Sequence, residues 1–187
     1  YSHMLCKFLE EYGIFNSLSD LIEKTISIQN RKAILLDIMN LFEQGKYEMF
    51  INAIPIQIEG LFDDYLNCGT IYKRFTDLAL YPNATLRDKL DVSLVKMPEI
   101  SPDAVHYFKF YFNNIIRNKV AHGVDAVYLT GNVPLRAYAV ELLLDLNFIV
   151  YLISKSSEAE KMYSYVTGFF LWTDKMGKGK DDFAYGC

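Results

Sequence analysis

The 187-residue sequence contains few of the residues from which metal sites and disulfide frameworks are built. It has three histidines, and His3 lies in Ser2-His3-Met4, a tripeptide typical of an expression-vector remnant. The other two histidines are too few for a multi-histidine metal site. An odd number of cysteines without metal-type spacing indicates reduced thiols in a cytoplasmic protein: these are Cys6, Cys68 and Cys187. We therefore expect no metal, no cofactor and no disulfide.

The sequence motifs of many enzyme families are also absent. The chain has no P-loop, no dinucleotide-binding glycine pattern, no nucleophile elbow and no HExxH zinc motif. It shows no secretory signal, and we expect it to be part of a longer polypeptide. Its net charge is −4, so the protein as a whole has no affinity for nucleic acid. Any binding of nucleic acid must come from a local positive region.

What the sequence does contain is apolar residues at helical spacing along nearly its whole length. With 51% hydrophobic and 22% charged residues, it is typical of a globular protein, and the spacing predicts an all-α helical bundle. We expect an N-terminal helical extension over 1–45, a bundle over 46–172 and a flexible tail over 173–187. Pro55 predicts a kink or a break in a helix over 47–67. The expected helices cover about 4–12, a segment ending near 28, 31–44, 47–67, 70–80, 85–96, 102–123, 134–154 and a last segment to 172.

Two of these segments leave a choice of structure. The segment from 124 to 132 contains the one stretch that resembles a strand, but the turn residues at its end favour a loop. The helix over 134–154 is apolar enough to suggest a membrane span. Arg136, Glu141 and Asp145 interrupt it, and charges are costly in the middle of a bilayer. We therefore predict a buried core helix and no membrane contact.

The segment 102–123 combines strong helix signals with an unusual charge pattern. Ser101 and Pro102 suit a helix start, and Gly123 suits its end. No acidic residue occurs from 104 to 124, whereas Lys109 and Lys119 do occur there, so we expect an uncancelled local positive potential. The predicted buried stripe consists of Val105, Phe108, Phe112, Ile115, Ile116 and Val120.

Three polar residues near the end of this helix have side chains suited to phosphate chemistry. Asn118 and His122 are four residues apart, and therefore lie about one turn apart on one face. Arg117 points about 140° away from His122, but its side chain is long enough to reach a shared ligand. Histidine can move a proton, and a guanidinium can bind two phosphate oxygens. The alternative is a histidine that interacts with the helix dipole and an arginine in a surface ion pair.

The segment Arg117-Asn118-Lys119-Val120-Ala121-His122-Gly123 resembles the Arg-Asn-x-x-x-His signature of the HEPN superfamily, helical domains named for higher eukaryotes and prokaryotes nucleotide-binding. The segment 54–61, with Pro55, Gln57 and Glu59, is similar to a Pro-x-Gln-x-Glu helix of an uncharacterised bacterial branch of that superfamily. That branch often has a basic residue shortly after the glutamate, where this chain has Asp63 and Asp64. The resemblance covers about residues 46–155.

The resemblance implies an HEPN-like bundle that forms a homodimer and brings two copies of the motif to one cleft. Many members are metal-independent endoribonucleases in defence or toxin–antitoxin systems, so RNA and a cognate antitoxin are implied partners. By the resemblance, His122 would act as general base or acid, Arg117 would stabilise the scissile phosphate, and Asn118 would orient one of them. Glu59 and Lys119 would support the site. The implied products carry 2′,3′-cyclic phosphate and 5′-OH ends.

Other interpretations of these residues remain open. The chain is an enzyme under the first hypothesis, and under the second it is a non-catalytic helical module that binds RNA, a nucleotide or a partner protein. Lys109 and Lys119 are candidate RNA contacts under both. His106 lies about 24 Å from His122 along a straight helix, so we expect it to be a structural or exposed residue. We also expect Asp63 and Asp64 to be solvated. Stacking on bases and core packing are alternatives for Tyr107, Tyr111 and Phe112, and Tyr128 is a candidate for modification if the chain is a toxin.

Overall fold

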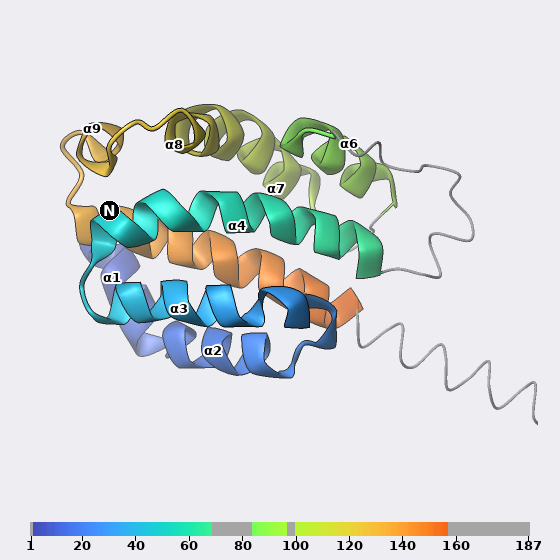
Figure 1. The fold of residues 1–187 in the computed structure, drawn as a ribbon, viewed down its shortest axis with the longest axis horizontal. Coiled ribbons are helices and arrows are strands. Elements are labelled where there is room, and N and C mark those ends of the chain that lie inside the picture. Colours follow the sequence, from blue (N-terminus) through green and yellow to red (C-terminus); the bar gives the residue numbers. More distant parts are fainter. Residues whose placement is uncertain (1, 69–83, 97–99, 157–187) are drawn as a thin grey trace, which may run out of the picture.

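The structure is a computed structural model that describes residues 2–68, 84–96 and 100–156, and within these ranges it contains helices and no strand (Figure 1). This confirms the predicted all-α bundle. The last helix of the described chain spans Leu135–Ser156. The others are α1 (Ser2–Glu11), α2 (Ile14–Lys24), η1 (Ile26–Arg31), α3 (Lys32–Glu43), α4 (Tyr47–Cys68), α6 (Leu86–Lys96), α7 (Pro102–His106), η2 (Tyr107–Arg117), α8 (Asn118–Ala121) and α9 (Ala126–Thr130).

Local signals set several helix ends as the sequence predicted. The Ser101 hydroxyl accepts a hydrogen bond from the backbone N–H of Ala104 at 3.2 Å, which satisfies one of the free donors at the start of α7. Gly45 and Gly123 follow α3 and α8 with φ of 71° and 75°, a left-handed conformation that other residues adopt at a cost. Ser101, Gly45 and Gly123 therefore act as the expected start and stop residues.

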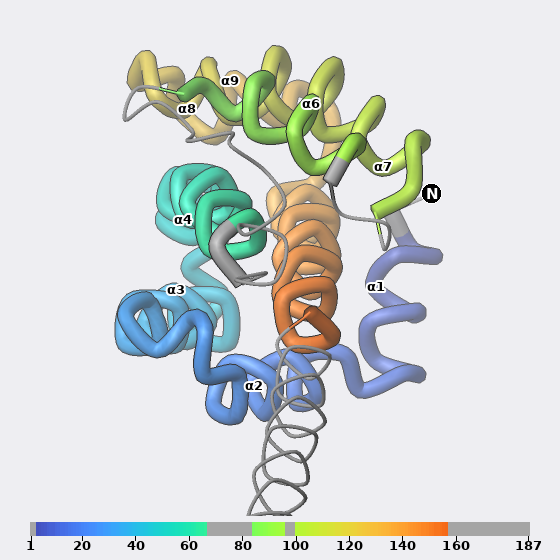
Figure 2. Tube along the Cα trace, turned by 90° about the vertical axis from the view of Figure 1, so that its right-hand side faces the viewer, coloured from blue at the N-terminus to red at the C-terminus, as the bar shows by residue number. Residues whose placement is uncertain are grey.

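The apolar helix Leu135–Ser156 lies at the centre of the bundle (Figure 2). α1, α2 and α4 surround it, and the layer of α6 to α9 covers one end of the arrangement in that view. Of the described helices, this one is long and apolar enough to cross a membrane, but 72% of its most apolar window is buried inside the protein. That burial is the pattern of a core helix. Its fully buried apolar side chains include Ala139, Val140, Leu142, Leu143, Leu146, Ile149, Val150 and Ile153.

One hydrophobic core joins the predicted N-terminal extension to the rest of the bundle. Leu18 and Leu35, which precede residue 46, belong to the same buried cluster as Ile58 and Leu146. The helices of segment 1–45 therefore contribute to the same core as the rest of the bundle. The predicted helix over 70–80, the last predicted helix and the tail over 173–187 lie outside the described residues.

Of the kink or break predicted at Pro55, the break was wrong, and the loop predicted after Gly123 was also wrong. α4 runs from Tyr47 to Cys68 without a break, although Pro55 lies within it and has no N–H to offer the carbonyl of Ile51. The side chains of Ile51 and Ile54 are fully buried, and this packing supports the helix through the proline. The expected loop after Gly123 contains the short helix α9, which begins where the Asp125 carboxylate accepts the Val127 N–H at 2.8 Å.

α7, η2 and α8 form one continuous helix over 102–121, which we call the motif helix. Its central part, η2, is a π-helix over Tyr107–Arg117, in which residues five apart are hydrogen-bonded: the Asn118 N–H donates to the Asn113 carbonyl. Such turns are wider than α-helical turns, so residues three apart diverge further around the axis. Ile115 is consequently 42% exposed, whereas the other residues of the predicted stripe are buried.

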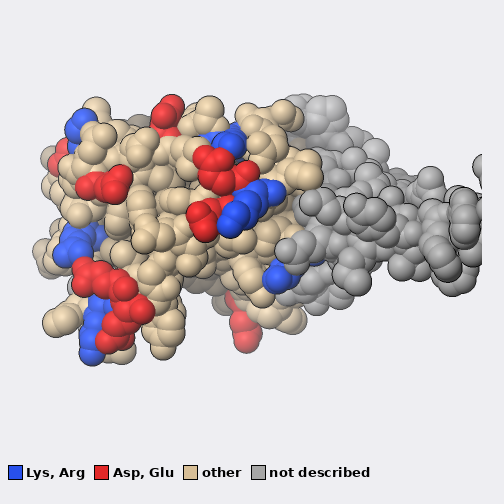
Figure 3. All heavy atoms as spheres, turned by 90° about the horizontal axis from the view of Figure 1, so that it is seen from below, with Lys and Arg blue, Asp and Glu red and all other residues tan. Residues whose placement is uncertain are grey.

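Charges of both signs are mixed on the side of the bundle opposite the motif helix. Figure 3 views this side, where α2 and α3 lie, and shows acidic and basic groups next to each other among many uncharged residues. Among its exposed ion pairs is Lys24 with Asp20 at 3.3 Å. No single sign of charge dominates this face, so it offers no electrostatic footprint for nucleic acid.

Candidate functional site

A cavity of about 560 Å³ lies between α4, the start of α6 and the motif helix. Arg117 and Asn118 of the predicted site line it, together with Glu59 of the second predicted segment. The structure therefore brings together two residues of the motif and the upstream glutamate, 58 positions apart in the sequence. The remaining lining residues are Ala84, Thr85, Leu86, Arg87, Asn113 and Asn114.

Arg117 is held from two sides. Its Nε donates to Glu59 Oε2 at 2.5 Å, and its Nη1 donates to the side-chain oxygen of Asn118 at 3.0 Å. The Arg117 side chain is 30% exposed and the Glu59 side chain 14%. The third nitrogen of the guanidinium, Nη2, makes no hydrogen bond with a described residue. It is therefore available to an anionic ligand in the cavity.

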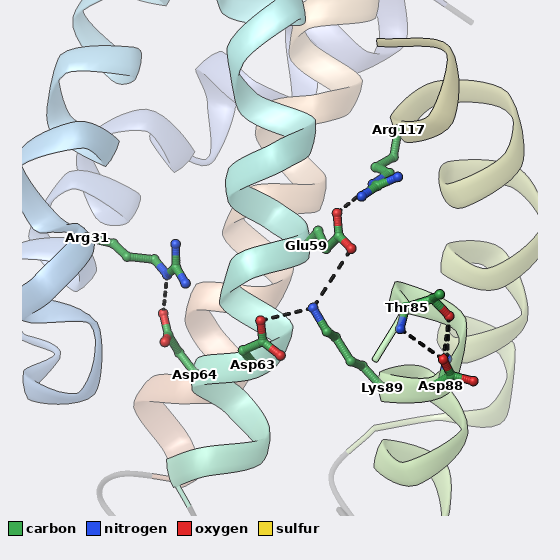
Figure 4. Close-up of polar contacts among 8 residues, drawn as sticks. All are labelled: Arg31, Glu59, Asp63, Asp64, Thr85, Asp88, Lys89 and Arg117. Carbon is green, nitrogen blue, oxygen red and sulfur yellow. Dashed lines mark hydrogen bonds and ion pairs between the residues drawn. The ribbon is translucent and has the colours of Figure 1, made fainter. Parts of the chain in front are cut away.

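Glu59 also belongs to a chain of ion pairs between α4 and α6 (Figure 4). The ammonium of Lys89 lies 3.8 Å from Glu59 Oε1 and 2.9 Å from Asp63 Oδ2, and its side chain is 8% exposed. Lysine is rarely buried without a partner, and Lys89 has two carboxylates. Arg117, Glu59, Lys89 and Asp63 thus form a network, which we call the Glu59 network.

Asp63 and Asp64 point in different directions, as expected for adjacent helical residues. Asp63 faces α6, while Asp64 accepts a hydrogen bond from Arg31 Nε at 2.6 Å on the other side of α4 (Figure 4). Asp64 is partly buried and ion-paired, so the prediction that it is a solvated surface residue was wrong, whereas the Asp63 side chain is 41% exposed and pairs with Lys89. Burial raises the pKa of Asp64, and Arg31 opposes that shift.

His122 lies at the exposed end of the motif helix. Its backbone N–H donates to the Asn118 carbonyl at 3.0 Å, which places it one turn beyond Asn118. Its side chain is exposed and is not part of the cavity lining. Within one chain, therefore, Arg117 and Asn118 share the cavity, and His122 lies beyond it on the open surface.

The two candidate RNA-binding lysines differ in their surroundings. The ammonium of Lys109 pairs with Asp91 of α6 at 2.5 Å, whereas Lys119 is exposed and has no ion pair with a described residue. With Glu59 bound to Arg117, two of the three cations in the acid-free window are neutralised by carboxylates from other helices. The prediction of an uncancelled positive potential was therefore wrong for Lys109 and Arg117.

The other aromatic and histidine candidates lie away from the cavity. His106 is exposed and its ring lies 4.6 Å from that of Phe110, as expected for a residue outside the site. Phe112 is fully buried. The Tyr107 hydroxyl lies 3.0 Å from the buried carboxylate of Asp145, so this tyrosine is a core residue. Tyr111 is partly exposed and hydrogen-bonds to Glu141.

Tyr107, Asp145 and Glu141 form a partly buried polar cluster between η2 and the central helix. The Tyr107 hydroxyl is 3.5 Å from Glu141 Oε1. Burial raises the pKa of both carboxyls and of the tyrosine, since the charged form of each group is poorly solvated there. This cluster joins η2 to the central helix and is separate from the cavity.

Sequence reasoning missed four polar residues of the cavity: Thr85, Arg87, Asn113 and Asn114. Thr85 directly precedes α6. Its hydroxyl accepts the Asp88 N–H at 3.3 Å, and the Asp88 carboxylate accepts the Thr85 N–H at 2.9 Å. The spacing of these two residues is that of a capping box, and it was a visible sign of the start of α6. Asn113 and Asn114 each lie four residues before a motif residue, Arg117 and Asn118. Helical spacing therefore places them on the same face, and this spacing was the sign that could have found them.

The residues that the structure describes contain no group of three or more histidine, cysteine, aspartate or glutamate side chains placed to hold a metal ion. The polar groups of the cavity are guanidinium, amide and hydroxyl groups, with one carboxylate that is already paired. Such groups suit an anionic or hydrogen-bonding ligand better than a cation.

Comparison of the chain with family models, with curated proteins and with solved structures found no match. The likeness to the HEPN superfamily therefore rests on the residues at 54–61 and 117–123. Both segments take part in one site, through the Glu59–Arg117 ion pair.

Proposed function

We propose that the protein is a metal-independent endoribonuclease that acts as a homodimer, with Arg117, Asn118 and His122 of both copies forming a composite site. One observation carries this proposal. Glu59 and Asn118 orient the Arg117 guanidinium in a cavity, and His122 is exposed one turn further along the same helix. A phosphate bound at the cavity mouth would meet the guanidinium from one side and an imidazole from the other.

The proposed reaction is attack of a ribose 2′-oxygen on the adjacent phosphorus. One His122 imidazole removes the proton of the 2′-hydroxyl while the new P–O2′ bond forms and the P–O5′ bond breaks. The leaving 5′-oxygen takes a proton from the imidazolium of the second copy. Arg117 stabilises the additional negative charge on the phosphate oxygens in the transition state through Nη2. The products have 2′,3′-cyclic phosphate and 5′-OH ends.

The motif helix and α9 offer apolar surface for the proposed dimer. Large contiguous patches of exposed apolar side chains mark interaction surfaces. Those on these two helices are Phe110, Tyr111, Ile115, Val127 and Tyr128. Pairing of two motif helices would cover part of this surface and bring two copies of His122 together.

The decisive experiment incubates the purified protein with RNA in EDTA and identifies the product ends by their reactivity toward kinase and phosphatase. Cleavage is expected for the native protein, and His122→Ala is expected to reduce it by about 10²–10⁴-fold. His106→Ala is the matched control, because this exposed histidine lies on the same helix away from the cavity. Equal activity of the native and His122→Ala proteins would refute the proposal.

A second function is supported by a different observation. Arg117 is neutralised by Glu59, and His122 does not line the cavity, so the motif also fits a helical module that binds RNA, a nucleotide or a partner without cleaving it. In that case Arg117→Gln would lower the melting temperature, and RNA would remain intact with every variant. We further propose a cytoplasmic location and, for a toxin, a cognate antitoxin as partner.

A further inference from the structure

The cavity beside Arg117 contains more polar groups than the proposed cleavage chemistry requires. Asn113 and Asn114 precede the motif, and Arg87 comes from α6, yet all three line the same space. We propose that these three residues form a subsite for one nucleotide of single-stranded RNA, with Asn113 and Asn114 contacting the base and Arg87 the phosphate. This inference rests on the proposed function, since it names the part of the RNA that the site would bind.

The size of the cavity fits such a unit. Its volume of about 560 Å³ lies within the range of roughly 300–1,000 Å³ that is usual for pockets binding small molecules and cofactors. Proteins that recognise RNA sequence generally bind unpaired bases, whose hydrogen-bonding edges are free. A cavity that opens next to the proposed cleavage site could accept the base of a neighbouring nucleotide.

The amide groups supply the means of recognising a base. The Asn113 Nδ2 donates to the Asn114 Oδ1 at 3.2 Å, which fixes the two side chains relative to each other. Asn113 then retains its oxygen as an acceptor, and Asn114 its nitrogen as a donor. A neighbouring donor and acceptor match the edge of a nucleobase, which also presents donors and acceptors side by side. The π-helical turn also stacks Asn113 below Asn118, so a third amide faces the same space.

Among the described residues, Arg87 is the cation of this cavity that has no ion pair. Arg117 is paired with Glu59, whereas Arg87 has no ion pair with a described residue. Its guanidinium lies 5.8 Å from the centre of the Phe110 ring, a contact that positions the group without cancelling its charge. The backbone donors at the start of α6 are partly used by the Thr85–Asp88 capping box, so the side chain of Arg87 is the available phosphate contact.

The test measures binding separately from cleavage. The His122→Ala protein is titrated with AMP, GMP, CMP and UMP, and with inorganic phosphate, by calorimetry and by NMR of the asparagine side-chain amides. We expect at least one nucleotide to bind more tightly than phosphate and to shift those amide signals. Asn113→Ala/Asn114→Ala and Arg87→Gln are each expected to weaken binding by about tenfold, the effect of losing one well-placed polar contact.

Matched controls use the same residue types away from the cavity. Arg136→Gln changes an exposed arginine that pairs with Glu10, and Asn40→Ala changes an exposed asparagine of α3. Neither is expected to alter nucleotide binding. Phosphate binding as tight as nucleotide binding, or an equal loss in Arg136→Gln and Arg87→Gln, would overturn the subsite.

The outcomes for the subsite and for the proposed function are distinguishable. Nucleotide binding that depends on Asn113 and Asn114, with RNA left intact by the native protein, would support the subsite and refute the nuclease. RNA cleavage that depends on His122, with KM unchanged in the asparagine and Arg87 variants, would support the nuclease and refute the subsite.

Discussion

Replacing Glu59 by glutamine is expected to destabilise the protein more than replacing Lys89 by methionine, although the two residues belong to one network. Glu59 contacts two cations, Arg117 at 2.5 Å and Lys89 at 3.8 Å. Its removal leaves the Lys89 ammonium, which is 8% exposed, with Asp63 as its remaining described partner. Removal of Lys89 instead leaves Glu59 paired with Arg117, whereas removal of Glu59 leaves Arg117 without a carboxylate partner in the described part of the chain.

The magnitudes follow from burial and from the contacts that remain. Removing one partner of a fully buried ion pair costs about 3–5 kcal/mol. Glu59→Gln should cost less, about 2 kcal/mol, because glutamine keeps an oxygen acceptor and Asp63 still pairs with Lys89. Lys89→Met should cost under about 1 kcal/mol, since an apolar side chain of similar length avoids the desolvation of an ammonium. For a domain of this size, these values correspond to about 4–8 °C and under about 4 °C in melting temperature.

The measurement is urea unfolding of the three proteins and of the double variant, followed by circular dichroism. The double variant should be more stable than Glu59→Gln alone, because methionine removes the cation that glutamine leaves under-neutralised. Asp20→Asn is a suitable control, since it breaks an exposed ion pair with Lys24 and should change stability by less than about 1 kcal/mol. A loss in Lys89→Met equal to or larger than that in Glu59→Gln would refute the reasoning.

Four further outcomes are expected. Asp145→Asn should raise stability more at pH 8 than at pH 5. Burial raises the folded-state pKa of Asp145, so the native protein loses stability as the pH rises above the ordinary pKa of an aspartate, whereas asparagine cannot titrate. An equal gain at both pH values, measured by urea unfolding, would contradict this. Ser101→Ala should cost about 1 kcal/mol in unfolding free energy, because it removes the hydrogen bond to the Ala104 N–H; an unchanged melting temperature would show that this cap is not needed. Phe112→Ala should cost about 3–5 kcal/mol, since the ring is fully buried and packs on Phe108 at 5.3 Å; a loss under 1 kcal/mol by urea unfolding would mean that the site is less tightly packed. If the subsite binds RNA, Arg87→Gln should reduce the salt dependence of single-strand binding by about 0.7 in the slope of log K against log salt, measured by fluorescence anisotropy; an unchanged slope would show that Arg87 contacts no phosphate.

The sequence predicted those features that depend on neighbouring residues. Ser101, Gly45 and Gly123 mark helix ends because each acts on backbone groups within a few positions. The spacing of apolar residues likewise predicted the central core helix. The break predicted at Pro55 was wrong because the effect of a proline on a helix is estimated from the backbone alone. Burial of Ile51 and Ile54 against other helices supports the helix through Pro55.

Features that depend on distant partners were not predictable in this way. The segment 104–124 is free of acids, but Glu59 and Asp91 reach its cations from helices that are far away in sequence or separated by a loop. The π-helical turns of η2 were also missed, and with them the exposure of Ile115. A charge count or a periodicity evaluated in one window cannot include these effects.

The pairing of Arg117 changes how the proposed site would recognise RNA. A free guanidinium attracts phosphate over a distance of about a Debye length, but one that is bound to a carboxylate at 2.5 Å contributes little net field outside the cavity. The ion pair with Glu59 therefore weakens the long-range attraction of Arg117 for phosphate and fixes the orientation of its Nη2. Affinity must then come from short-range contacts, and the cavity supplies these as three amides and Arg87, which has no ion pair with a described residue. A site built in this way would favour particular nucleotides over RNA in general, because hydrogen bonds to base edges distinguish bases and charge does not.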